Sequence, residues 1–275
     1  MRKMHSFKIF MRYILIFLIV FIFNIPIINV VITSFKTNAE LVSPSFLLFF
    51  KPTLEHYAAI FNGTTFDFTL FLFNSIIVSF LTSFITLLLT IPAAYGITVH
   101  NIGSKFVLPF ISSLRIIPLV IFAIPIFILY SNLGLIDTRI GLVIVYLLFE
   151  IPLTLILVVA FMQDVPKETI EAARIDGAGE YSILLKIVVP MMIPSLIAVL
   201  VLSFLYSWGE FLFALLLTVK NATTLPVGAT LFITAFQIEW GNIAAVVVLS
   251  IVPPIILSFY LRKYMIEAYS GASKE

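Results

Sequence analysis

The sequence predicts an all-α integral membrane protein with six transmembrane helices. The first observation is composition, since 61% of the 275 residues are hydrophobic and only 11% are charged, where a soluble domain carries roughly 25% charged residues. The second is a set of six apolar runs, each long enough for the roughly 20 residues that a helix needs to cross a bilayer. These expected spans form a single domain over residues 1–275 and cover about 10–33, 70–99, 106–131, 140–163, 188–219 and 241–262.

The six runs differ in ways that predict local structure. The first follows a basic start, but it is too long for a cleaved signal peptide and lacks a small-residue cleavage site, so we expect an uncleaved anchor. The second and fifth are long enough to tilt or to continue beyond the lipid. Prolines interrupt the third to sixth runs, where we expect them to kink the helices at Pro118, Pro125, Pro152, Pro190, Pro194, Pro253 and Pro254.

The distribution of basic residues predicts the orientation. With a cytoplasmic N-terminus, eleven Lys and Arg residues lie on the cytoplasmic side and four on the other, and such an excess marks the cytoplasmic face. Both termini are then cytoplasmic, as six spans require. Residues 34–69 become an ordered external loop, and residues 164–188 become a cytoplasmic loop.

Several function classes find no support in the sequence. There are no cysteines and three scattered histidines, so no metal site is expected. A net charge of +2 gives no argument for nucleic acid. The phosphate-binding pattern GxxxxGK[ST] and the metalloprotease pattern HExxH are both missing. We therefore expect a non-enzymatic chain that binds no cofactor.

The loop 164–188 predicts two short helices. Pro166 suits the first turn of a helix, and we expect Asp164 to help cap that turn. Charge pairs of Glu171 with Lys167 and with Arg174 have helical spacing. The small side chains that follow Glu171 offer a face for close approach by another protein. Gly177 is placed to end the helix with a left-handed residue, and a second helix over about 179–188 then leads into the fifth span.

This loop also carries a long motif. Glu171, Ala172, Ala173, Gly177, Ile187 and Pro190 match, at the same spacing, the signature loop of ATP-binding-cassette (ABC) importer permeases. Asp176, Gly177 and Ala178 add the carbohydrate-type extension, and Val189 replaces the usual Leu. Further similar stretches cover 73–97, 124–146, 207–215 (with Gly209 where Asn is usual) and 224–232. The chain resembles the permeases of binding-protein-dependent sugar importers, in particular the smaller permease subunit of maltose-type transporters.

The resemblance implies the transmembrane domain of a type I ABC importer in the plasma membrane of a bacterium or archaeon. It implies four kinds of partner: a second permease subunit in a heterodimer, two cassette ATPase subunits that use ATP and Mg²⁺, an external solute-binding protein, and membrane lipid. It also implies that the cytoplasmic loop couples ATP hydrolysis to transport, through Glu171, Ala172, Ala173, Arg174, Asp176, Gly177 and Ala178. We expect the last residues, around 271–274, to touch the ATPase as well.

Polar and aromatic residues inside the spans are candidates for a substrate pathway or gate: Arg115, Glu210, Trp208, Tyr206 and Asn74. A charged side chain at membrane depth is costly unless it faces protein or a cavity. For each of them a structural interpretation stands beside the functional one. Arg115 lies near enough to the cytoplasmic boundary to extend its charge to water. Glu210 and Asn74 suit structural pairs or helix-end contacts, and Trp208 suits an interfacial anchor.

The solute is less constrained than the transporter class. An anionic solute calls for more basic residues in the spans than Arg115 alone, and a polyamine calls for more acids, so a neutral di- or oligosaccharide is favoured. Polyamine, phosphate and glycerol phosphate remain alternatives within the same superfamily. A secondary transporter is a further alternative, for which intramembrane acid pairs or inverted repeats are expected.

Overall fold

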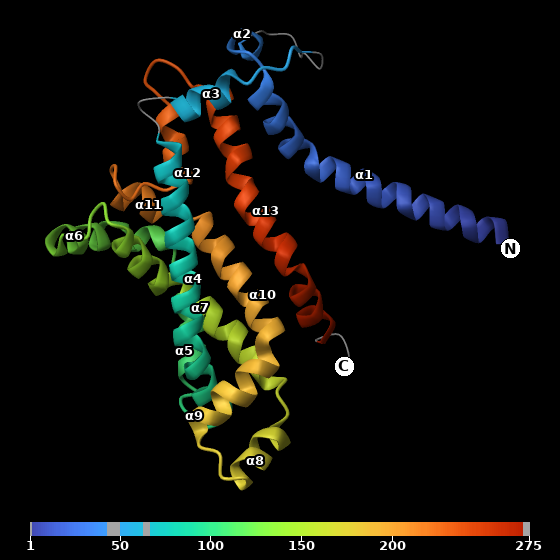
Figure 1. Cartoon of the computed structure of the whole chain (residues 1–275), viewed down its shortest axis with the longest axis vertical. Helices are drawn as coiled ribbons and strands as arrows, with labels where there is room; N and C mark the ends of the chain where they lie inside the picture. The colour runs from blue at the N-terminus through green and yellow to red at the C-terminus, as the bar shows by residue number, and fades with distance from the viewer. Residues whose placement is uncertain (1, 43–49, 63–66, 272–275) are drawn as a thin grey trace. The chain divides into compact units, whose positions relative to one another are not determined.

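The computed structural model describes residues 2–42, 50–62 and 67–271 (Figure 1). The chain divides into two compact units, one of residues 1–68 with 229–251 and the other of residues 69–228 with 252–275. Helices dominate both units, and the only β pairing among the described residues is an isolated bridge between Ile233 and Ile238. The prediction of an all-α membrane protein is confirmed.

The first unit contains the first expected span and most of the segment predicted as an external loop. Its elements are α1 (Arg2–Phe35), α2 (Asn38–Leu41), α3 (Glu55–Asn62), η3 (Ala229–Phe232) and the first turns of α13 (Trp240–Gly271). Thr37 begins α2 with a capping box, because its hydroxyl accepts the Glu40 N–H while the Glu40 carboxylate accepts the Thr37 N–H. The segment expected as an external loop therefore includes two helices, and its residues 43–49 and 63–66 lie outside the described part.

A buried histidine ties this unit together. His56 of α3 is 2% exposed, and its ring nitrogens lie 2.8 Å from the Lys36 carbonyl oxygen and 2.8 Å from Asn242 Oδ1. The ring also packs on Gly241, where an added Cβ would stand 2.0 Å from His56 Nε2. Helix α13 thus approaches α3 so closely that only glycine fits at this position.

The second unit contains the second to fifth expected spans, and the sixth, in α13, is divided between the two units. Its elements are α4 (Phe68–Thr98), α5 (Val107–Leu114), η1 (Leu119–Phe122), α6 (Ala123–Leu133), α7 (Arg139–Gln163), α8 (Lys167–Ile175), α9 (Glu180–Ile183), η2 (Leu184–Val188), α10 (Val189–Trp208), α11 (Leu212–Leu217) and α12 (Leu225–Gly228). Across the described residues, five helices are long and apolar enough to cross a membrane, and the number is six if one bent pair of helices counts as a single span. This agrees with the predicted six-span fold class.

The third span is not the single helix that the run 106–131 suggested. It consists of α5 and the η1–α6 segment, which meet at an angle of 87°. Pro118 lies in the break between Leu114 and Leu119. Proline lacks an N–H for the helical ladder and disfavours helical geometry in the residue before it. The expected kink is therefore a break.

The fifth span also has different limits from the predicted 188–219. The helix runs continuously from Glu180 to Trp208, so the expected separate helix over 179–188 is its first part. Leu184–Val188 form a π-helical turn within this helix. Pro190 has no N–H group to donate to the Lys186 carbonyl four residues earlier, so the turn lies where the regular helical hydrogen bonds are interrupted. The helix ends at Trp208, before the predicted limit of 219, and Gly209 follows it. The next helix, α11, begins separately at Leu212.

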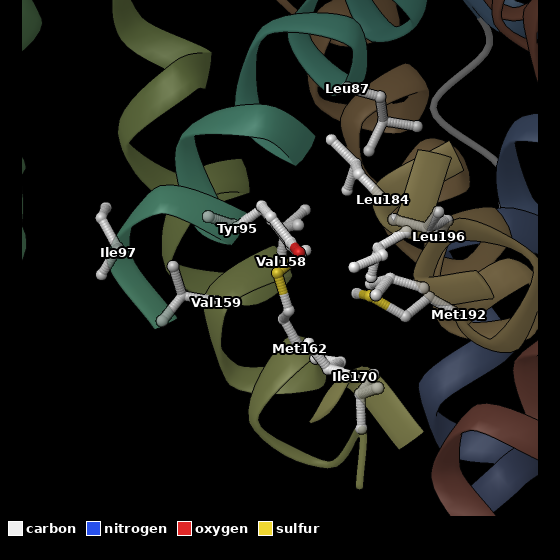
Figure 2. Close-up of a cluster of buried hydrophobic side chains, with 14 of the residues drawn as sticks. Leu87, Tyr95, Ile97, Val158, Val159, Met162, Ile170, Leu184, Met192 and Leu196 are labelled. Carbon is white, nitrogen blue, oxygen red and sulfur yellow. The ribbon is translucent and has the colours of Figure 1, made fainter. Parts of the chain in front are cut away.

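Two buried clusters hold the second unit together. One joins α4, α7, α8 and α10 and includes Tyr95, Val158, Met162, Ile170 and Met192 (Figure 2). The other joins α6, α7 and α11 and includes Tyr130, Tyr146 and Phe213. The first cluster connects helix α8 to three helices of membrane-spanning length.

Candidate functional site

The segment 164–188, predicted as a cytoplasmic loop, folds as a helix, a glycine bend and a second helix at one end of the second unit (Figure 1). Helix α8 starts directly after Pro166 without a side-chain cap, so the prediction that Asp164 caps this turn is wrong. Pro166 itself occupies the N-cap position, and its side chain has no hydrogen-bonding group. Gly177 has φ +82°, which confirms that it ends the helix in the left-handed conformation.

Helix α8 has one face in the core and one face exposed. Ile170 and Ala173 are 4% and 8% exposed and belong to the buried cluster, where Figure 2 shows Ile170 beside Met162 of α7. Glu171, Ala172 and Ile175 are exposed, and Ile175 retains 87% of its accessible surface. The predicted small face for a partner is therefore half wrong: Ala172 is available, whereas Ala173 packs inside its own chain. Burial follows helical spacing, because residues 170 and 173 lie three apart.

Glu180 is the central polar contact of this segment, and the sequence interpretation missed it. Arg174 Nε and Nη2 donate to its two carboxylate oxygens over 2.7 and 3.1 Å. The Tyr95 hydroxyl donates to Glu180 Oε2 over 2.7 Å, and His100 Nε2 lies 3.1 Å from the same oxygen. The hydrogen bond to Glu180 raises the pKa of the Arg174 guanidinium.

The expected pairing of Arg174 with Glu171 is replaced by this contact. A separation of six residues across a glycine bend is not a helical neighbour distance, so periodicity gives no signal for Glu180. Of the other predicted coupling residues, Asp176 and Gly177 are exposed at the bend, and Ala178 packs partly against the buried cluster. Residues 272–274, expected at the ATPase, lie outside the described residues.

Glu171 and Arg174 also line a cavity of about 570 Å³, together with Lys167, Asn101 and Ser104. The cavity lies where α8 faces the turn that follows α4. The segment 164–188 is thus attached to the rest of the second unit by its apolar face and by the Glu180 contacts.

Three of the predicted pathway residues have structural partners. Asn74 is fully buried, donates to the carbonyls of Asn221 and Thr223, and accepts from Arg139 Nε over 2.6 Å. The Glu210 carboxylate accepts the N–H groups of Phe213 and Ala214 at 2.9 and 3.1 Å and so caps α11. Trp208 is 8% exposed, with its ring 5.5 Å from that of Phe204. These contacts favour the structural alternatives for Asn74 and Glu210, whereas the burial of Trp208 does not fit the interfacial anchor expected for it.

Asp137, between α6 and α7, fixes the segment that Asn74 also holds. With φ +57°, it directs one carboxylate oxygen at the N–H groups of residues 219–222. Burial acts to raise the pKa of Asp137, but the backbone hydrogen bonds outweigh it, and the pKa lies below its usual 3.8. A carboxylate held by a row of backbone N–H groups anchors this turn.

The remaining two pathway candidates are brought together. Arg115, in the break of the third span, and Tyr206 of α10 line one cavity of about 540 Å³. Glu150 of α7, buried to 1% exposure, lines it as well. This cavity and the coupling segment are the two candidate sites of the second unit.

Comparison with known proteins identifies the family. Residues 86–269 match the family model described as "Binding-protein-dependent transport system inner membrane component", which is more than half of the chain. The chain belongs to this family. It is thus a multi-pass membrane permease component of the ABC importer type, a class that works with ATPase and solute-binding partners. Membership in this family leaves no support for a secondary transporter.

Individual relatives cover almost the whole chain. The sulfoquinovosyl glycerol transport system permease SmoH of Agrobacterium fabrum is 33% identical over 249 residues, 90% of this chain and 87% of that protein. The trehalose/maltose transport system permease MalG of Thermococcus litoralis is 30% identical, over 90% of each chain. A chain of a bacterial ABC transporter that imports the acidic polysaccharide alginate has a TM-score of 0.76 at 24% identity, with 96% of this chain and 98% of that chain covered. That likeness confirms the importer fold.

Proposed function

We propose that this chain is one of two different permease subunits of an ABC importer that carries a di- or oligosaccharide into the cytoplasm by alternating access. An external binding protein delivers the sugar, and two cassette ATPase subunits supply the energy from ATP and Mg²⁺. The chain itself performs no catalysis. Its termini and the loop 164–188 lie in the cytoplasm.

The observation that carries the coupling role is the two-faced α8. Its exposed face presents Glu171, Ala172 and Ile175, while its buried face joins the cluster that holds α4, α7 and α10. A partner that moves the exposed face therefore pushes against close-packed side chains, which transmit displacement instead of absorbing it. The match to the importer signature around Glu171 and Gly177 supports the same role.

The absence of cysteine from the chain allows a clean test of ATPase docking. Ala172→Cys places a thiol on the exposed face, and Ala173→Cys places the same thiol one residue further on the buried face. In membranes that contain the whole importer, a short bifunctional maleimide should join Ala172→Cys to a single-cysteine ATPase subunit. Ala173→Cys is the matched control and should give little product. Equal cross-linking by both variants, or none by Ala172→Cys, would contradict the docking model.

The sugar assignment is supported by the two relatives above, which are named for transport of sulfoquinovosyl glycerol and of trehalose or maltose. Its test is the ligand of the cognate external binding protein, followed by uptake into proteoliposomes that hold the complete importer. We expect ATP-dependent uptake of a labelled di- or oligosaccharide. Binding and uptake of only spermidine, phosphate or glycerol phosphate would replace the sugar with another solute and leave the transporter class intact.

A further inference from the structure

The cavity at the break of the third span has a wall of mixed chemistry. Its volume is about 540 Å³, within the roughly 300–1,000 Å³ typical of small-molecule sites. Arg115 comes from the break, Phe122 from η1, Phe149 and Glu150 from α7, and Tyr206 from α10. The wall thus combines a guanidinium, a carboxyl group, a phenol and two phenyl rings.

Glu150 is held in place by hydroxyl groups of α10. Ser203 donates to Oε1, and Ser207 donates to Oε2 over 2.8 Å. A carboxylate has about four acceptor positions, so two remain for further donors. Glu150 lies eleven residues beyond Arg139 in the 25-residue α7, which is about 17 Å along the helix at about 1.5 Å per residue. It is therefore close to the middle of the span.

The backbone of α7 adds an acceptor in the same wall. Pro152 has no N–H, so the Leu148 carbonyl, four residues earlier, loses its helical donor. Both residues line the cavity. A carbonyl at membrane depth without its helical partner favours a site where another donor can bind.

Arg115 and Glu150 line this cavity from different elements, yet no ion pair joins them in the described part of the chain. Opposite charges that share a cavity without contact leave room for a ligand that accepts from one and donates to the other. The aromatic part of the wall is rigid, because the Phe149 ring lies 5.7 Å from that of Phe122 and 4.9 Å from that of Phe213.

We infer that this cavity binds a sugar ring of the transported solute within this subunit. Sugar hydroxyls donate to Glu150 and to the Leu148 carbonyl, Arg115 donates to sugar oxygens, and the apolar C–H face lies against Phe149 and Tyr206. A polyhydroxyl ring matches this wall because it offers donors and acceptors on its rim and an apolar face. The inference rests on the proposed function and adds to it that this chain contacts the sugar directly.

The test measures sugar retained by the assembled importer. The complex is loaded through its binding protein with radiolabelled maltose, trehalose or arabinotriose, trapped with ATP and vanadate, and separated from free sugar. We expect the wild-type complex to retain one of these probes. Glu150→Gln and Arg115→Gln should each reduce retention by about tenfold or more, as loss of a charged hydrogen bond predicts. Ile124→Ala, on the 71%-exposed Ile124 of α6 outside the cavity wall, is the control and should retain sugar normally.

The outcomes separate this inference from the proposed function. Because Arg115 is exposed, its replacement tests the site even where a Glu150 variant fails to assemble. Unchanged retention in Arg115→Gln and Tyr206→Phe would overturn the sugar site while leaving the importer assignment intact. Loss of the second permease subunit from the purified Arg115→Gln complex would make the cavity a subunit interface and also overturn it. Retention of spermidine or phosphate in place of all three sugars by the wild-type complex would instead contradict the proposed function.

Discussion

Replacement of Gly177 by alanine isolates the bend between α8 and α9. Gly177 has φ +82°, and an added Cβ would meet no atom within 4 Å. The substitution therefore introduces no clash, and its cost is conformational. An L-residue in the left-handed region costs about 1–2 kcal/mol, which is a factor of roughly 5–30 in an equilibrium constant. Relief of that strain requires the bend to reopen, which separates Arg174 from Glu180.

The assay is ATP hydrolysis by the reconstituted importer, with and without its loaded binding protein, alongside solute uptake. We expect Gly177→Ala to lower both stimulated hydrolysis and uptake by about 5- to 30-fold while the protein stays in the membrane. Gly179→Ala is the matched control. Its Cβ also meets nothing within 4 Å, but its φ is −73°, so the same methyl group adds no strain there and activity should be unchanged. Equal loss in both variants, or normal coupling in Gly177→Ala, would refute the argument that backbone geometry at the bend is what matters.

Three further substitutions test packing and electrostatics through thermal unfolding in detergent. Ala173→Leu should destabilise the chain by about 1–3 kcal/mol because the larger side chain overfills the buried cluster. Ala172→Leu, on the exposed face, should leave the melting temperature nearly unchanged. A larger loss of stability in Ala172→Leu than in Ala173→Leu would contradict the assigned faces of α8. Gly241→Ala should cost about 3 kcal/mol, because its Cβ would overlap the ring of His56, and a neutral result would contradict that contact. Asp137→Asn should cost about 1–2 kcal/mol near neutral pH. Since the folded pKa of Asp137 is lowered, its contribution is present above about pH 4 and is lost as pH falls through the folded pKa, so the variant should lack this acid-dependent loss.

Much of the fold follows from the sequence because its signals are local. Long apolar runs predict membrane-spanning helices, and Gly177 predicts the end of α8 because few other residues take a positive φ. The limits of the spans were harder to predict. Hydropathy is the same on both sides of Gly209, so the apolar run continues to 219 although the helix ends at Trp208. Pro118 indicates a disruption, but an angle of 87° is set by packing that hydropathy does not report.

In the candidate sites too, local features could be predicted from the sequence and long-range contacts could not. The coupling residues were predicted from a motif with fixed spacing, and their role stays a prediction. The assignment of Ala173 to the partner-facing surface failed because exposure depends on which helix lies behind it. Glu180 and Glu150 act through residues distant in the sequence, namely Tyr95 and the serines of α10. Such contacts arise only when α4, α7 and α10 come together. Neither contact could therefore be predicted from the local sequence pattern.

The contacts of Glu180 give the coupling segment a defined path to the membrane spans. Arg174 lies on α8, Glu180 begins the helix that continues into α10, and Tyr95 lies near the end of α4. A displacement of α8 that kept these hydrogen bonds would move α4 and α10 together, while the buried contacts of Ile170 would carry α7 with them. Glu180→Gln should therefore weaken the response of transport to ATP hydrolysis more than it lowers stability, because apolar packing still holds the segment in place. Comparison of uptake per ATP hydrolysed with the melting temperature separates the two effects. If uptake per ATP hydrolysed and the melting temperature fell in parallel, Glu180 would have a structural role only.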